Sequence, residues 1–457
     1  MQRNAPDFAN GSIARLLWSF ALPSAISGLI GAVYNIVDQI FIGRCVGLLG
    51  NAATNVVFPV VTLTNAVAIM AGVGGASGFN LSIGRRDEKE AGRMIGSGLM
   101  LMAIAGCVIA LAMQLFMEPL MRFFGATEET FSYACEYERI VACAIPLFIL
   151  GTGGSAMIRA DGSPKYALVS VVAGAVLNVG LDALFMLGFG MGIAGAAWAT
   201  LIGQVISGCL VIGYFAFRFR TIRLQREHFR LSPAKMRRVF SLGMGPFINH
   251  FSMTLIQIML NNALVTWGAV SQYGSEIPLA CAGIAAKVNA IVSSIVVGIA
   301  QGAQPIISFN YGAKNYRRAR ETGAWAIAAV LSFSFVVFAA FQAFPRQITM
   351  LFGKYDNPAY YDFAEKYFRI FMMLVCVSGM QITVGNFFTS LGKPWMSVLI
   401  SASRQIVALP ILLLTLPRAW GLDGVLYAGP IADGICAALA IALFVKIWYN
   451  MGKQAVD

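Results

Sequence analysis

Charged residues, histidines and catalytic motifs are all scarce in this chain. Lysine, arginine, aspartate and glutamate together make up 12% of the 457 residues, whereas a typical soluble domain has about 25%. The chain has two histidines, eight cysteines without a CxxC spacing, no HExxH motif and no GxxxxGK[ST] loop. These absences argue against a zinc site, a disulfide framework, a metallohydrolase and a nucleotide-driven pump within the chain. We therefore expect a protein that is not an enzyme and that needs no cofactor.

Apolar residues fill most of the chain instead. They make up 58% of it, and the mean hydropathy is +0.72. A membrane-spanning helix needs roughly 20 apolar residues, so this composition indicates an all-α, multi-pass protein of the cytoplasmic (inner) membrane. The predicted spans are 15–42, 51–83, 92–117, 136–159, 165–188, 192–217, 239–268, 277–310, 320–344, 362–390, 395–417 and 422–448.

Basic residues gather in alternate loops between the predicted spans. One set of loops holds dense clusters, the longest of which runs from Arg218 to Arg238, whereas the other set holds only scattered basic residues. Cytoplasmic loops carry the excess of lysine and arginine, so both termini are predicted to be cytoplasmic. A net charge of +12 would suggest nucleic acid for a soluble protein. Here the charge follows from topology, and no nucleic-acid partner is expected.

The chain also repeats itself at an interval of 223–230 residues. GFNLSIGRRDEKEAGR after the second span is similar to IISFNYGAKNYRRAR after the eighth, and DGSPKYALVS is similar to LGKPWMSVLI. Parallel repeats of this kind are typical of transporters. We therefore predict twelve transmembrane helices in two six-helix lobes related by a parallel internal repeat. The N-terminal lobe is 1–217, a basic cytoplasmic linker is 218–238, and the C-terminal lobe is 239–457.

Two acidic residues lie inside predicted spans of the N-terminal lobe. Asp182 lies in the fifth span with Asn178 one turn before it, and Asp38 lies in the first span with Tyr34 one turn before it. A charged side chain at membrane depth costs roughly 2.5–3.5 kcal/mol on insertion scales, so such residues usually have a function. Carboxylate, amide and hydroxyl oxygens are hard ligands that suit a small cation, and two close carboxyl groups would readily share a proton. The sequence therefore predicts one ion site that serves either Na⁺ or H⁺.

Several stretches together resemble the multidrug and toxic compound extrusion (MATE) family, most of all its bacterial multidrug members. They are LPSAISGLIGAVYNIVDQIFIG, ASGFNLSIGRRDEKEAGR, IRADGSPKYALVSVVAGAVLNVGLDALFM, GIAGAAWAT and GAQPIISFNYGAKNYRRA. The resemblance covers essentially the whole chain, and it implies a two-lobed twelve-helix fold. It also implies export of amphipathic organic cations, driven by inward flow of Na⁺ or H⁺. The family's cation site in the N-terminal lobe falls here on Asp38, Asn178, Asp182, Thr200 and Tyr34.

The C-terminal lobe departs from the pattern of some family members. Those members carry acids in spans seven and ten, whereas span seven here has amides and His250 but no acid. We therefore expect ion coupling in the N-terminal lobe alone. Second-rank candidates for the substrate path are Asp433 in span twelve, Lys287 in span eight, Arg404 in span eleven, and His250. Lys287 and Arg404 could pair with Asp433 or line the path.

Other interpretations remain open from the sequence. Asn178 could serve only as an interhelical hydrogen bond, and the Thr200 hydroxyl could satisfy its own backbone. The whole chain could be a flippase of lipid-linked precursors on the same fold, although such proteins meet phosphates with several arginines or lysines. The whole chain could also be a channel. For the antiporter, the expected partners are amphipathic cations and membrane lipids, and the expected working unit is a monomer.

Overall fold

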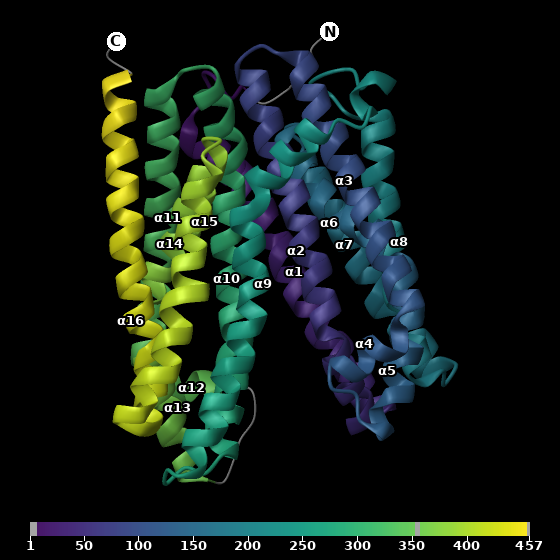
Figure 1. Cartoon of the computed structure of the whole chain (residues 1–457), viewed down its shortest axis with the longest axis vertical. Helices are drawn as coiled ribbons and strands as arrows, with labels where there is room; N and C mark the ends of the chain where they lie inside the picture. Colours follow the sequence, from purple (N-terminus) through teal and green to yellow (C-terminus); the bar gives the residue numbers. More distant parts are fainter. Residues whose placement is uncertain (1–6, 352–356, 455–457) are drawn as a thin grey trace.

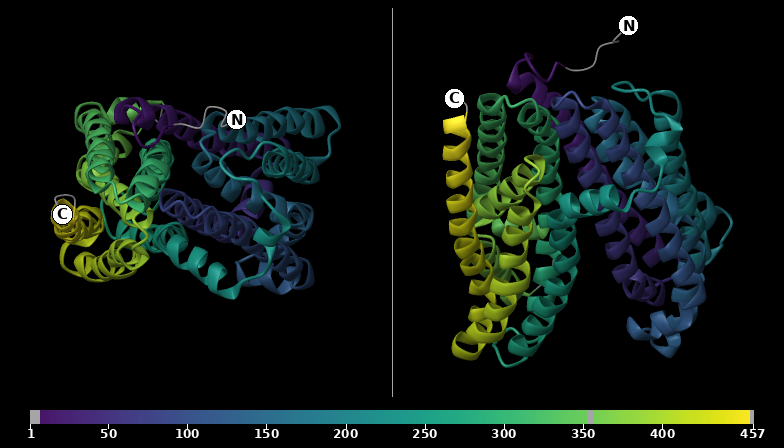
Figure 2. Two further views of the ribbon diagram at one scale, coloured as in Figure 1. Left: turned by 90° about the horizontal axis from the view of Figure 1, so that it is seen from above. Right: turned by 45° about the horizontal axis from the view of Figure 1, so that its top comes forward.

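The computed structural model describes residues 7–351 and 357–454, and its secondary structure there is helical (Figure 1). Two bundles of helices lie side by side, with both chain ends at the same end of the molecule. The bundles meet at that end and diverge toward the opposite end, as Figures 1 and 2 both show. The predicted all-α fold is confirmed in this part of the chain.

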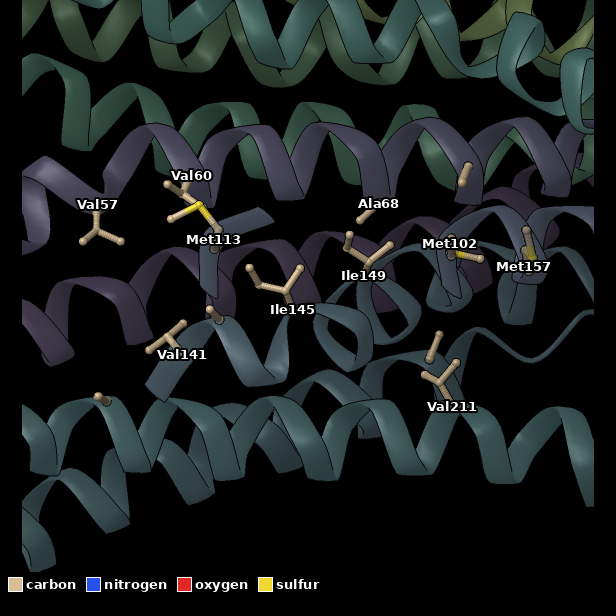
Figure 3. Close-up of a cluster of buried hydrophobic side chains, with 14 of the residues drawn as sticks. Val57, Val60, Ala68, Met102, Met113, Val141, Ile145, Ile149, Met157 and Val211 are labelled. Atoms are coloured by element: carbon tan, nitrogen blue, oxygen red, sulfur yellow. The ribbon is translucent and has the colours of Figure 1, made fainter. Parts of the chain in front are cut away.

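The first bundle contains the first half of the chain. Its helices are α1 (Ile13–Cys45), α2 (Leu48–Gly84), α3 (Glu88–Leu115), α4 (Met117–Phe123), α5 (Glu128–Val141), the short η1 (Ala142–Ala144), α6 (Ile145–Ala160), α7 (Pro164–Asp182), the π-helical η2 (Ala183–Gly188) and α8 (Gly192–Phe217). Its core is apolar, and Figure 3 shows part of it, where Val57 and Val60 of α2 lie near Met113 and Val141.

The second bundle follows the 3-10 turn η3 (Arg226–Phe229). Its helices are α9 (Pro233–Ala269), α10 (Glu276–Gly312), α11 (Tyr316–Ala343), α12 (Pro345–Met350), α13 (Pro358–Phe371), α14 (Val375–Ser390), α15 (Pro394–Ala402), the π-helical η4 (Ser403–Ala408) and α16 (Leu409–Gln454).

All twelve predicted spans fall on helices, although some helices are broken. Ten helices in the described residues are long and apolar enough to cross a membrane. Predicted span ten corresponds to α13 and α14, which bend by 44° at the residues between them. Predicted spans eleven and twelve lie in one helical stretch, Pro394–Lys453, which is broken at Gly421, where φ is 59°. Because glycine has no Cβ, it adopts this left-handed conformation without strain.

The internal repeat is visible in the backbone. Arg86 and Lys314 both have a positive φ, and each lies two residues after the end of a long helix, at Gly84 in α2 and at Gly312 in α10. The next residue in each copy, Asp87 or Asn315, accepts a hydrogen bond from the first turn of the following helix. Side-chain caps of this kind satisfy backbone N–H groups that a helix start leaves unpaired. The two halves therefore use the same turn chemistry at equivalent positions.

The two bundles approach most closely in the half of the molecule that holds the termini. There α2 packs on α9, and α1 packs on α10. A side chain at Gly74 would overlap the carbonyl of Val239, and one at Gly243 would overlap the carbonyl of Met70. Gln304 of α10 reaches across to α2, where its Nε2 donates to the Ser77 hydroxyl at 2.8 Å. Glycine and one buried amide thus allow backbone-to-backbone contact between the bundles at this end.

The segment between α8 and α9 is fixed to the first bundle. Asp161, at the end of α6, accepts hydrogen bonds from the Tyr214 hydroxyl at 2.6 Å and from the backbone N–H groups of Arg220 and Thr221 at 2.9 Å. Further along, the buried His228 lies against Gly92 and Gly96 of α3, where any side chain would overlap it. The predicted linker 218–238 is therefore ordered along this surface, and its last residues, from Pro233, begin α9.

Candidate functional site

The aspartates at the centre of the predicted ion site lie on two helices that pack together, α1 and α7. Asp38 is 7% exposed and Asp182 is fully buried. Their carboxyl groups are close enough to share a hydrogen bond when one of them carries a proton. Within the described part of the chain, no donor reaches either oxygen of Asp182 or Oδ1 of Asp38. No donor from the described residues therefore stabilises these three oxygens in their charged form.

Asn178, Thr200 and Tyr34 surround this pair. Asn178 Nδ2 donates to the Thr200 hydroxyl at 3.3 Å, which links α7 to α8. The amide oxygen of Asn178 is buried and receives no donor from the described residues. Tyr34 lies one turn before Asp38 on α1, and its hydroxyl is within electrostatic range of both carboxyl groups. The structure thus brings together all five residues that the sequence assigned to the site.

Tyr137 is a further member of this cluster that the sequence analysis missed. It is buried on α5, its hydroxyl shares a hydrogen bond with Thr200, and Asp38 and Tyr34 lie within electrostatic range of it. Nothing in the spacing around Tyr137 distinguishes it from the many tyrosines that pack in membrane helices. Only the tertiary contact between α5 and α8 reveals its place.

The next residue on α5, Glu138, is also buried. It is 1% exposed, and neither carboxyl oxygen has a hydrogen-bond partner among the described residues. The fourth span was predicted to begin at residue 136, which would place Glu138 close to a membrane surface. The structure instead begins the span at Glu128. Two further helical turns therefore separate Glu138 from the start of the span.

Four free oxygens and a hydroxyl fit a small hard cation or a proton better than a transition metal. The unpartnered atoms are three carboxylate oxygens and one amide oxygen, and oxygen ligands of these types suit small hard cations. In the residues that the structure describes, no cluster of three or more His, Cys, Asp or Glu side chains could hold a metal ion. The chemistry of the donor set therefore suits a small hard cation or a proton.

A cavity of about 190 Å³ lies among helices of the second bundle. Its polar lining consists mostly of neutral side chains from α9, α14 and η4, such as Asn249, Gln257 and Gln405. Two residues of α2, Ile69 and Val73, also line it. The cavity therefore lies where the second bundle faces the first.

The second-rank candidates separate into two groups. His250, Arg404 and Asp433 line the cavity, and Arg404 Nε donates to Asp433 Oδ1 at 2.5 Å. Lys287 is exposed on α10 and is outside the cavity lining. Asp433 therefore pairs with Arg404 and not with Lys287.

Comparison with known proteins identifies the family of the chain. The model of the MatE family matches residues 23–184 and again residues 251–414. The chain belongs to the MatE family. The two separate matches fall in the two bundles, in agreement with the internal repeat. The resemblance inferred from the sequence motifs is thereby confirmed.

Two relatives illustrate where this MatE protein lies within the family. It is 23% identical over 442 residues to the multidrug export protein MepA of Staphylococcus haemolyticus, covering 96% of this chain and 95% of that protein. It is 22% identical over 439 residues to MepA of Staphylococcus aureus, covering 95% and 94%. These relatives are transporters rather than enzymes.

Solved structures share the fold over nearly the whole length. An outward-facing multidrug resistance MATE family transporter of the MOP superfamily superposes with a TM-score of 0.90 at 22% identity, covering 99% of both chains. A MOP superfamily transporter from Pyrococcus furiosus gives the same values and is described as having a binding pocket of reverse polarity that suggests a different function. At this identity the likeness establishes the fold.

Proposed function

We propose that this MatE protein is an antiporter that exports amphipathic organic cations in exchange for Na⁺ or H⁺. The observation that carries the proposal is the pair of buried carboxyl groups on α1 and α7, which face each other without a protein donor. An isolated charge in a low-dielectric interior is costly, so this pair favours an added cation or proton. The coupling ion would be held by Asp38, Asn178, Asp182 and Thr200, with Tyr34 beside them.

The relatives support the choice of cargo. Proteins related along the whole chain bear the name multidrug export protein. Apolar side chains such as Met253 and Phe371 line the cavity of the second bundle together with amides. Flexible, methionine-containing walls adapt to ligands of different shape.

Alternating access is the mechanism that this arrangement favours. With both termini in the cytoplasm, as the basic linker predicts, the bundles meet at the cytoplasmic side and diverge toward the outside. A ligand moves such an equilibrium only by its different affinity for the two states. The coupling ion would act at the packing of α1 on α7, because the carboxyl pair belongs to both helices.

The setting of the protein follows from the same proposal. It would act in the cytoplasmic membrane as a monomer, with lipids and small amphipathic cations as its partners and no nucleic acid. The flippase alternative is less well supported, because only one arginine lines the cavity and no lysine does so in the described residues. A phosphate-bearing lipid headgroup would need several such cations.

Transport into proteoliposomes tests the proposal. A cationic dye, with Na⁺ and pH gradients imposed separately, should be driven by at least one gradient in the wild type. Asp38→Asn and Asp182→Asn should each abolish gradient-driven transport, because an amide binds neither a proton nor Na⁺ as a carboxylate does. Glu129→Gln, an exposed acid on α5, is the matched control and should keep wild-type activity. Normal coupling in both aspartate variants would reject the proposal.

A further inference from the structure

The only arginine among the residues that line the described cavity is already paired with the only acid there. Arg404 Nε lies 2.5 Å from Asp433 Oδ1, and the two side chains are 24% and 8% exposed. A purely cationic ligand that takes over Asp433 Oδ1 would have to displace Arg404 from it. The arginine is the more accessible member, so the cavity presents a cation to an incoming ligand before it presents an anion.

The backbone around this pair is unusual and firmly held. Arg404 lies in η4, a π-helical turn within a transmembrane span, and such turns are frequent at functional sites. Gln381 of α14 donates to the backbone carbonyl of Asp433 at 2.7 Å, which fixes α16 beside the pair. The charged groups are thus held at a defined place on the wall of the cavity.

The rest of the wall is neutral. Amide side chains such as Asn249 and Gln257 alternate with apolar groups such as Phe371 and Met372. The wall therefore offers hydrogen bonds and apolar contact, but its charge discrimination depends on Arg404 and Asp433. Arginine presents a planar fork of five N–H donors that matches a carboxylate, and the bond to Asp433 uses one of them.

We propose that this cavity is a subsite for zwitterionic amphiphiles, in which Arg404 binds the carboxylate of the substrate and Asp433 faces its cationic group. When a zwitterion binds, its carboxylate takes the place of Asp433 beside Arg404, and its cationic group takes the place of Arg404 beside Asp433. Neither buried charge is then left without a partner. A simple cation instead leaves Arg404 without a partner. The subsite rests on the proposed export function, but it makes a separate claim, because it concerns cargo selection in the second bundle and not the ion site of the first.

A matched pair of dyes tests the subsite. A rhodamine with a free carboxyl group is a zwitterion, and its methyl ester is a cation with the same ring system. Binding of each dye to the purified full-length protein is measured by fluorescence anisotropy without any gradient. The wild type should bind the free acid more tightly than the ester.

Two single variants should shift this preference in opposite directions. Arg404→Gln should weaken binding of the free acid by about 10- to 100-fold, the range for a lost charged hydrogen bond, and should leave ester binding equal or tighter. Asp433→Asn should weaken binding of the ester more than binding of the free acid, because the freed Arg404 still binds the carboxylate that only the free acid carries. The double variant should bind the two dyes alike, and Arg418→Gln, an exposed arginine of α16, should behave as the wild type.

The outcomes separate the possible failures. Loss of fold would weaken both dyes together, whereas opposite shifts have no such explanation. The subsite would be overturned if Arg404→Gln weakened binding of both dyes equally while thermal unfolding stayed unchanged. It would also be overturned if the wild type bound the ester more tightly than the free acid. If the dye preference is found but proteoliposomes show no gradient-driven transport of either dye, the proposed antiport fails and the subsite stands.

Discussion

At the scale of single residues, the two bundles differ in how their buried carboxyl groups are neutralised. In the first, Asp38 and Asp182 face each other without a cationic partner in the described residues. In the second, Asp433 is neutralised by Arg404. A carboxyl pair needs an external positive charge, whereas an ion pair is complete without one. The first arrangement suits coupling to an ion, and the second suits discrimination among ligands.

Tyr137 provides a residue-scale prediction. Its hydroxyl shares a hydrogen bond with Thr200 beside the carboxyl pair, and a net hydrogen bond contributes about 0.5–1.5 kcal/mol. Tyr137→Phe should therefore change the apparent affinity for the coupling ion by roughly 2- to 12-fold while the fold is kept. Titration of dye efflux against Na⁺ and pH measures this change. Tyr133→Phe, one turn earlier on α5, is the control, and an identical titration curve in both variants would contradict the prediction.

The sequence was sufficient to predict the residues whose chemistry is unusual at membrane depth. Asp38 and Asp182 are recognisable because charges are rare in apolar runs, and Asn178 because it lies one turn from an acid. Tyr137 and Glu138 were missed for different reasons. A buried tyrosine is ordinary in such helices, and Glu138 depended on where α5 begins. That start was ambiguous because the acidic residues of α5 lower its hydropathy.

At the scale of elements, the connection between the bundles is held by one buried carboxyl group. Asp161 lies outside the membrane-spanning helices and accepts the hydrogen bonds that fix residues Arg220 and Thr221. Burial nevertheless raises the pKa of Asp161 above its ordinary value, because the loss of solvation outweighs the hydrogen bonds that lower it. The folded chain therefore holds this proton more tightly than the unfolded chain does.

The sign of the resulting pH dependence is fixed by linkage. The contribution of this proton to stability is complete below about pH 4, the ordinary range of aspartate, and is lost as the pH rises through the raised pKa. Thermal unfolding of the purified protein, measured at increasing pH from about pH 4, should show this decline in the wild type. Asp161→Asn should remove the decline and lower the melting temperature, since an amide nitrogen accepts no hydrogen bond. A wild type and variant with parallel pH profiles would exclude this role, and Glu129→Gln is the control for a change of charge alone.

At the scale of the whole molecule, the repeat could be predicted but the open shape could not. The turns Gly84–Asp87 and Gly312–Asn315 can be predicted from the sequence, because glycine and capping residues recur at equivalent positions. Which ends of the bundles meet depends on close packing between α2 and α9. A glycine such as Gly243 has no feature in the sequence that distinguishes a helix contact from a lipid-facing position.

The contact at Gly243 gives a prediction for the lobes. A methyl group at this position overlaps the carbonyl of Met70. Gly243→Ala should therefore disfavour contact between the bundles at the end that holds the chain termini. It should shift the conformational equilibrium toward a state in which the bundles close at the other end. Spin labels at exposed positions Glu129 and Asp362, in a cysteine-free background, should report a shorter mean distance. Gly213→Ala, where a side chain meets no neighbour within 4 Å, is the control. An unchanged distance distribution in the Gly243 variant would rule the contact out as the determinant of shape.

The short segment 228–233, which connects the His228 contact on α3 to the start of α9, limits how the second bundle can move. Because His228 is fixed on α3 and α9 begins at Pro233, the chain between them reaches at most about 18 Å. The second bundle can therefore turn about this point but has little freedom to translate away from it. Helix α9 has 37 residues with Pro246 inside it, so its length is at most about 55 Å. A rotation of about 10° at residues 228–233 would move the far end of α9 by at most about 10 Å, so small rotations at the anchored end become larger displacements where the bundles diverge.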